Sequence, residues 1–180
     1  MQDVANGIAM PKYEQFLKTK KKTFIESGFE VDENTLNKFL FDFQRHSVKI
    51  ALQKGRFALF FDCGLGKTLM QLAWSESVFN YTGKKVLILA PLAVVEQTKD
   101  EATHFGINLQ SFDITNYEQL ENIDTSIYAG VVLDESSMLK SKEGKRSNLI
   151  LDTFKNTPYK LACTATPSPN DPMELGNHSE

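Results

Sequence analysis

The sequence has few of the features that mark secreted, membrane or metal-binding proteins. It contains only two cysteines, Cys63 and Cys163, among 180 residues. Two cysteines make no disulfide framework, which favours a reducing cytoplasm. No apolar run approaches the ~20 residues of a membrane span, and the N-terminus has no apolar signal core. The three histidines are scattered without metal-ligand spacing. We therefore expect a cytoplasmic protein with no membrane contact.

Charge of one sign is not in excess either. With 41% hydrophobic residues, 24% charged residues and a net charge of −3, the chain has the composition of a soluble globular protein. That charge argues against a surface uniformly coated for nucleic acid. Two local basic clusters remain, each readable as a solvated face or as a nucleic-acid contact. They are Lys18, Lys20, Lys21 and Lys22, and then Lys140, Lys142, Lys145 and Arg146.

Short apolar runs alternate with helical patterns along most of the chain. The runs predict buried strands at 57–61, 86–90, 130–133 and 159–163, with a weaker strand at 110–114. Helices are expected at 68–80, 93–105 and 146–154, and one or two amphipathic helices within 34–53. Such alternation predicts an α/β fold of three layers, with a mainly parallel sheet covered by helices. Residues 1–35 are polar and irregular, and we expect them to be an appended N-terminal segment.

The stretch FFDCGLGKTL, residues 60–69, has the layout of a phosphate-binding loop: strand, glycine turn, helix. Backbone N–H groups of such a turn converge on an anion. Lys67 adds a positive charge for the phosphates, and the Thr68 hydroxyl is a Mg²⁺ ligand. The match is incomplete, because Phe61 stands where the full pattern has glycine. An ordinary strand-to-helix turn is the alternative.

Polar residues also follow the strands that end near 133 and 163. Asp134 and Glu135 are adjacent carboxylates, suited to binding Mg²⁺ beside Thr68 and to polarising the attacking water. TATP, residues 164–167, supplies hydroxyls that can bond the acidic pair. Taken singly, each is also readable as an exposed turn. Because the carboxyl ends of parallel strands meet at one edge, we expect a single site there.

In their order along the chain, these segments resemble motifs I, II and III of superfamily 2 helicases, most closely the Swi/Snf-type branch. The segments are DCGLGKT (62–68), LDESS (133–137) and TATPSPND (164–171). Three more stretches resemble motifs Ia, Ib and the Q motif: LILAPLAVVEQT (87–98), ITNYEQL (114–120) and LFDFQ (40–44). The chain is also similar, as a whole, to phage and prophage helicases of this group. The resemblance covers about residues 36–176 and implies a RecA-like P-loop NTPase domain.

The resemblance implies a role for each matching residue. ATP would be bound by Gln44, which reads the adenine, and by Cys63, Gly64, Leu65, Gly66, Lys67, Thr68 and Leu69. Lys67, Asp134 and Glu135 would be catalytic, with Mg²⁺ held by Thr68 and Asp134. Thr164 and Thr166 would couple the site to nucleic acid, which would lie along Pro91, Leu92, Thr115, Asn116 and Tyr117.

Motors of this superfamily need two RecA-like lobes, with ATP between them. Residues 36–180 resemble the first lobe, and no motif of a second lobe follows. We therefore expect a second lobe and DNA, by the Swi/Snf likeness double-stranded, as partners, and weak ATPase activity of this lobe alone. Ser137, where histidine is commoner, weakens the expected link to motif III. The alternatives are a nucleotide-binding regulatory module without motor activity and a small-molecule phosphotransferase.

Overall fold

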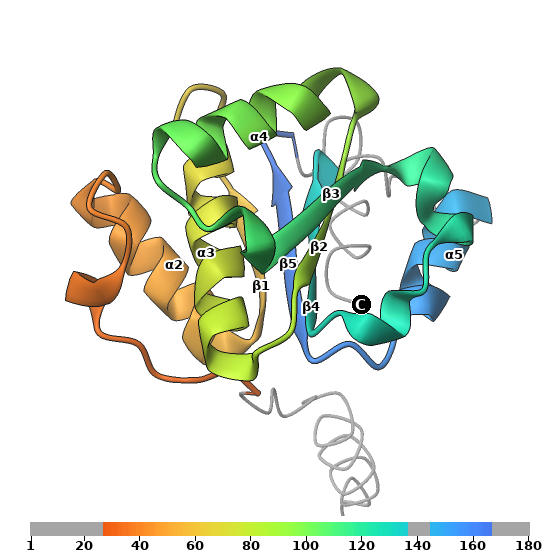
Figure 1. Ribbon diagram of the computed structural model, residues 1–180, viewed down its shortest axis with the longest axis horizontal. Helices are drawn as coiled ribbons and strands as arrows, with labels where there is room; N and C mark the ends of the chain where they lie inside the picture. The colour runs from red at the N-terminus through yellow and green to blue at the C-terminus, as the bar shows by residue number, and fades with distance from the viewer. Residues whose placement is uncertain (1–26, 137–144, 167–180) are drawn as a thin grey trace, which may run out of the picture.

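The computed structural model describes residues 27–136 and 145–166 (Figure 1). The strands are β1 (Arg56–Phe60), β2 (Val86–Ala90), β3 (Phe112–Asn116), β4 (Gly130–Asp134) and β5 (Tyr159–Thr164). The α-helices are α2 (Asp42–Lys54), α3 (Lys67–Thr82), α4 (Val95–His104) and α5 (Lys145–Phe154). Short 3₁₀ helices are η1 (Glu33–Thr35), η2 (Leu92–Val94), η3 (Leu109–Ser111), η4 (Tyr117–Asn122) and η5 (Thr125–Ile127).

The five strands form one sheet in the order β1-β5-β4-β2-β3, and every neighbouring pair is parallel. The order places β5 between β1 and β4, so the ends of these three strands lie side by side. In register, Phe60 pairs with Thr164 and Asp134 pairs with Cys163. The parallel sheet expected from the alternating pattern is thus confirmed, and its carboxyl edge collects the polar segments that follow β1, β4 and β5.

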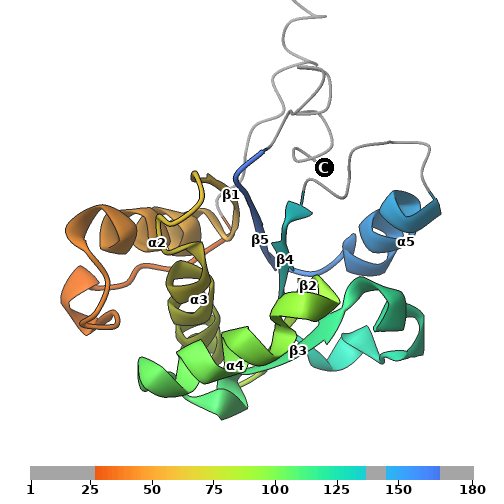
Figure 2. The same cartoon turned by 90° about the horizontal axis from the view of Figure 1, so that it is seen from above.

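Helices cover both faces of the sheet. Figures 1 and 2 show α2, α3 and α4 on one side and α5 on the other. Alternate residues of β2 separate accordingly: Val86 and Ile88 join the cluster under α2, α3 and α4, whereas Leu87 and Leu89 join the cluster that includes Phe154 of α5. A strand buried on both faces reads as a continuous apolar run, which is why β2 was predictable. The three-layer α/β architecture is confirmed.

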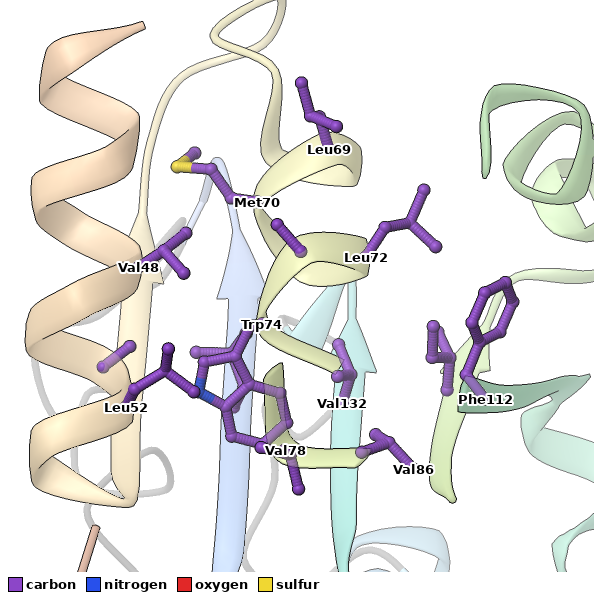
Figure 3. Close-up of a cluster of buried hydrophobic side chains, with 14 of the residues drawn as sticks. Val48, Leu52, Leu69, Met70, Leu72, Trp74, Val78, Val86, Phe112 and Val132 are labelled. Atoms are coloured by element: carbon purple, nitrogen blue, oxygen red, sulfur yellow. The ribbon is translucent and has the colours of Figure 1, made fainter. Parts of the chain in front are cut away.

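Helix α3 lies at the centre of the larger cluster (Figure 3). Residues 69–75 are all buried, and Trp74 is fully enclosed. Val48 and Leu52 of α2 and Val132 of β4 approach the same region. Because α3 is packed on several sides, its first turn, which follows the glycine loop, is held in a fixed place relative to the sheet.

Within 34–53, where one or two helices were expected, one α-helix is confirmed as α2. The stretch before it differs from the helical pattern, because residues 36–41 contain no helix and have a turn at 38–39. Asn37 explains the difference, because its side chain accepts from the N–H of Phe39 and donates to the carbonyl of Phe105. Such side-chain bonds compete with helical ones. The weaker strand also lies two residues later than expected, as β3.

Residues 27–31 pack against the domain although they lie before the expected boundary at residue 36. The N–H of Phe29 donates to the carbonyl of Leu52, and its ring stacks on Tyr81 at a centroid distance of 4.0 Å. None of the described helices has the length and apolar character needed to cross a membrane.

Candidate active site at the carboxyl edge of the sheet

The glycine loop joins β1 to α3 and has the backbone that its two glycines allow. Gly64 and Gly66 have φ of 80° and 72°, in the left-handed region that residues with a Cβ avoid. Gly66 directly precedes the first residue of α3. The first N–H groups of a helix have no intrahelical partner and favour anions. The loop therefore has the geometry of a phosphate-binding turn.

Lys67, the first residue of α3, directs its side chain back to the start of the loop. Its Nζ donates to the carbonyl of Phe61 at 2.9 Å and to that of Asp62 at 3.1 Å. The ammonium group is thereby kept beside the loop and not in bulk water. Thr68 and Leu69 follow on the first turn, Thr68 half-buried and Leu69 buried, while Cys63 on the loop is an exposed free thiol.

Gln44 of α2 contacts the same loop from the other side. Its side chain is 3% exposed. Oε1 accepts from the N–H of Phe41, and Nε2 donates to the carbonyl of Leu65, both at 2.9 Å. Each end of the amide thus has one partner within the chain, and its second N–H and second oxygen lone pair have no partner in these two bonds. The predicted adenine-reading role of Gln44 stays a prediction.

Asp134 ends β4 beside the loop and is held by Gln71, a residue that belongs to none of the motifs. Gln71 of α3 donates from Nε2 to Oδ1 of Asp134 at 2.6 Å. Burial raises the pKa of the Asp134 carboxyl above its usual value, while the bond from Gln71, the backbone N–H of Glu135 and the charge on Lys67 oppose that rise. A polar residue within the apolar stretch 69–74 was the one sequence signal for Gln71.

Glu135 follows with an unusual backbone. It is the one residue other than glycine with positive φ, at 52°, in the described part of the chain. Such conformations in residues with long side chains are uncommon and gather at functional sites. Thr164, buried at the end of β5, directs its hydroxyl to Oε2 of Glu135 over 3.5 Å, and the N–H of Thr166 donates to Thr164 Oγ1 at 3.1 Å. The structure therefore brings the second and third polar segments together.

The residues expected along a nucleic-acid strand lie at the same edge, after β2 and β3. Ala90, the last residue of β2, pairs with Asn116, the last residue of β3. Pro91 and Leu92, which follow β2, therefore lie close to the end of β3. Leu92 is 71% exposed, and Thr115 and Asn116 are half-buried. The Asn116 side chain accepts from the N–H of Gln119 and caps η4.

Tyr117 differs from these residues, because its side chain points into the domain. It is 3% exposed, and its hydroxyl donates to the main-chain carbonyl of Asp134. Burial raises the pKa of this phenol well above its usual value. A side chain so enclosed has no face with which to contact a nucleic acid, and it fixes the end of β4 instead.

The donors present fit a Mg²⁺–nucleotide complex and not a protein-only metal site. Within residues 27–136 and 145–166, no group of three His, Cys, Asp or Glu side chains is placed to hold a metal ion. Mg²⁺ in nucleotide sites needs only one or two protein oxygens, since phosphates and waters complete its shell. Asp134 and Thr68 supply such oxygens. Thr68 and Asp134 as Mg²⁺ ligands stay a prediction.

Several expected features lie outside the described residues. They are the appended segment up to residue 26, the basic residues Lys18 to Lys22, Lys140 and Lys142, Ser137, and the PSPND part (167–171) of the third motif. Lys145 and Arg146 belong to the start of α5.

Comparison with known proteins agrees with this fold. The family described as "Type III restriction enzyme, res subunit" (ResIII) matches residues 27–169. Among curated proteins, the Bos taurus SWI/SNF-related matrix-associated actin-dependent regulator of chromatin subfamily A-like protein 1 is 29% identical over 157 residues, which are 76% of this chain and 16% of that protein. The chain therefore spans only a small part of this relative.

Solved helicase structures have the same fold at low sequence identity. The Pyrococcus furiosus Hef helicase domain superposes with a TM-score of 0.69 at 18% identity, over 79% of this chain and 36% of its own. The Sulfolobus solfataricus SWI2/SNF2 ATPase core, solved in complex with dsDNA, gives 0.67 at 19%, over 83% and 37%. The UvsW helicase from Bacteriophage T4 gives 0.64 at 14%, over 92% and 64%. The chain belongs to the ResIII family, and it has the fold of the first RecA-like lobe of superfamily 2 helicases of the Swi/Snf type.

Proposed function

We propose that this chain is the ATP-binding lobe of a nucleic-acid-dependent ATPase, a DNA translocase or helicase. One observation carries the proposal: the parallel order β1-β5-β4 gathers Lys67, Asp134, Glu135 and Thr164 at one edge of the sheet. Lys67 and Asp134 would also serve a nucleotide-binding module without motor activity, whereas Glu135, as a base for water, favours an ATPase.

In this proposal the loop and the first turn of α3 bind the phosphates. Backbone N–H groups of residues 64–69 converge on the β- and γ-phosphates, and Lys67 exchanges the carbonyls of Phe61 and Asp62 for phosphate oxygens. Thr68 and Asp134 would hold Mg²⁺, whose charge would neutralise the negative charge that develops on the phosphates.

Glu135 acts as the base in the same proposal. Its carboxylate orients the attacking water and accepts its proton. Thr164 is the neighbour best placed to report the state of Glu135, because the contact of 3.5 Å can shorten or break when the nucleotide changes. We propose that Thr164 and Thr166 thereby couple the nucleotide site to the nucleic-acid surface.

The nucleic acid would lie along the carboxyl ends of β2 and β3, where Leu92 is exposed. Pro91, Leu92, Thr115 and Asn116 are proposed contacts, whereas Tyr117 supports them from inside. Contacts of this kind go to phosphate and sugar and carry little base specificity. Double-stranded DNA is the proposed ligand, a choice supported by the SWI2/SNF2 core that was solved with dsDNA. A second RecA-like lobe would complete the ATP site.

The exposed thiol of Cys63 suits a reducing compartment, so we place this activity in the cytoplasm.

Calorimetric titration of the chain with Mg²⁺-ATP and with Mg²⁺-GTP tests the nucleotide site. We expect ATP binding that the Lys67→Ala variant lacks. Lys84→Ala is the matched control, since it removes the same charge from an exposed position just before β2, at the opposite edge of the sheet. Preference for ATP over GTP would support the adenine-reading role of Gln44, and equal binding would contradict that role alone. Loss of binding in both lysine variants, or in neither, would contradict a phosphate site at Lys67.

A further inference from the structure

Gln71 is a buried polar side chain that no motif explains. It is 1% exposed and lies among the apolar residues of α3 that pack against the sheet. A buried amide is costly unless it is hydrogen-bonded. Gln71 meets this need with Asp134, through a bond of 2.6 Å between residues 63 positions apart in the sequence. The bond is short because its acceptor is a carboxylate.

The position of Gln71 on α3 relates it to the phosphate loop. It follows Lys67 by four residues, and residues four apart share one face of a helix. The helix that begins with the phosphate-binding lysine therefore carries, one turn later, the donor to the carboxylate at the end of β4. Lys67 contacts the loop, Gln71 contacts Asp134, and one turn of α3 separates the two side chains.

The contact between Gln71 and Asp134 lies at the edge of the sheet, where the neighbour of Asp134 in the β4–β5 pairing is Cys163. Gln71 is a neutral donor, unlike a lysine or arginine at the same place. A neutral donor orients a carboxylate and leaves its full negative charge for a cation.

From this geometry we propose, on the basis of the function proposed above, that Gln71 is a positioning residue for the Mg²⁺ site. It fixes the rotation of the Asp134 carboxylate and its offset from the phosphate loop. A carboxylate has about four acceptor positions, so donors from Gln71 and the backbone of Glu135 still leave positions for a metal ion or a metal-bound water. Partners of this kind are worth about 10–100-fold in metal affinity at other sites.

The test separates metal affinity from nucleotide affinity. Mn²⁺ is titrated into the full chain kept in excess over ATP, and into ATP alone as the reference, and free Mn²⁺ is followed by its electron paramagnetic resonance signal. ATP binding is measured separately in EDTA. Gln71→Met keeps the length of the side chain without its donor, and Gln71→Leu removes the donor with an apolar side chain suited to a buried helix. Ser77→Ala is the control, because it removes a hydroxyl bonded to the carbonyl of Ala73 on the same helix.

We expect both Gln71 variants to bind ATP in EDTA within about twofold of the unaltered chain and to bind Mn²⁺ about 10-fold more weakly. Ser77→Ala should match the unaltered chain in both measurements. Unchanged Mn²⁺ affinity in a folded Gln71 variant would overturn the inference and leave the proposed function standing. If the unaltered chain bound no ATP in either buffer, the proposed function would fail, and the role of Gln71 with it.

Discussion

At the scale of single residues, the two loop glycines have different reasons to be glycine. Both have positive φ. A Cβ on Gly64 would meet nothing within 4 Å, whereas a Cβ on Gly66 would collide with Nε2 of Gln44. Gly64 is thus required only by its positive φ. Gly66 is required by its positive φ and also by the space that the Gln44 amide needs in order to bond the carbonyl of Leu65.

This difference predicts unequal costs for two otherwise identical changes. Gly64→Ala should lower the free energy of unfolding by about 1–2 kcal/mol, the cost of a left-handed residue with a Cβ. Gly66→Ala should lower it by about 1 kcal/mol more, because Gln44 loses a hydrogen bond. Urea denaturation followed by circular dichroism measures both values. Equal losses would show that Gln44 does not depend on the absence of a side chain at residue 66.

Residue-scale detail is also where sequence reasoning reached its limit. The motifs placed Lys67, Asp134 and Glu135 correctly at one sheet edge, because strand ends and glycine turns are local patterns. One partner of Gln44 lies 21 residues away and the side-chain partner of Asp134 lies 63 residues away, and nothing local specifies such contacts. Tyr117 shows the same limit: its place in a motif said nothing about the direction of its side chain.

At the scale of elements, the strands were predictable and the connections were not. The strand expected at 86–90 matches β2 at both ends. A continuous apolar run bounded by Lys85 and Pro91 is typical of a strand buried on both faces of a parallel sheet. The segment before α2 was misread as helix, because its apolar spacing ignored the turn made by Asn37. Periodicity describes burial, and side-chain bonds to the backbone decide where a helix begins.

Near the sheet edge opposite the phosphate loop, Lys85, Asp113 and Tyr128 form a cluster of polar side chains that links the starts of β2, β3 and β4. Lys85, just before β2, donates to Asp113 of β3 at 2.8 Å. Tyr128, two residues before β4, donates from its hydroxyl to the other oxygen of Asp113 at 2.9 Å. Burial and the bond to Asp113 raise the pKa of Tyr128 to about 12.

Tyr128→Phe should therefore destabilise the chain in a pH-dependent way. Below pH 10 the variant loses one hydrogen bond, worth about 1 kcal/mol. Between pH 10 and about 12 the phenol ionises in the unfolded chain but keeps its proton in the folded chain. The stability that Tyr128 contributes is complete below that window and falls as the pH rises through it. Denaturation at pH 7 to 12 should show the difference in unfolding free energy between the two proteins becoming smaller as the pH rises. A constant difference would contradict the contribution of the Tyr128–Asp113 hydrogen bond.

At the scale of the whole molecule, the described domain presents its site at an open edge. Phosphate loop, acidic pair and exposed Leu92 all lie at the carboxyl ends of the strands. The matched structures are longer than this chain, which spans 36–64% of them. We therefore expect the chain by itself to bind ATP and to hydrolyse it slowly.

Joining the chain to a second RecA-like lobe of a relative should raise its ATPase rate. An arginine finger from such a lobe is worth about 10³–10⁵-fold in related enzymes, and duplex DNA should raise the rate further. Phosphate release with and without duplex DNA measures this. The same fusion with Lys67→Ala is the control and should stay inactive. A fusion that is active without DNA dependence would point to a nucleotide-binding module of another kind.

The placement of Trp74 gives the protein an optical property of its own. It is the single tryptophan of the sequence, it is fully buried in α3, and its indole N–H has no acceptor among the described residues. An indole in so apolar a setting emits at short wavelength, and its emission moves to longer wavelength when water reaches it. Because Trp74 lies two turns after Lys67 on the same rigid helix, native fluorescence reports directly on whether the core that supports the phosphate loop is intact, without any label.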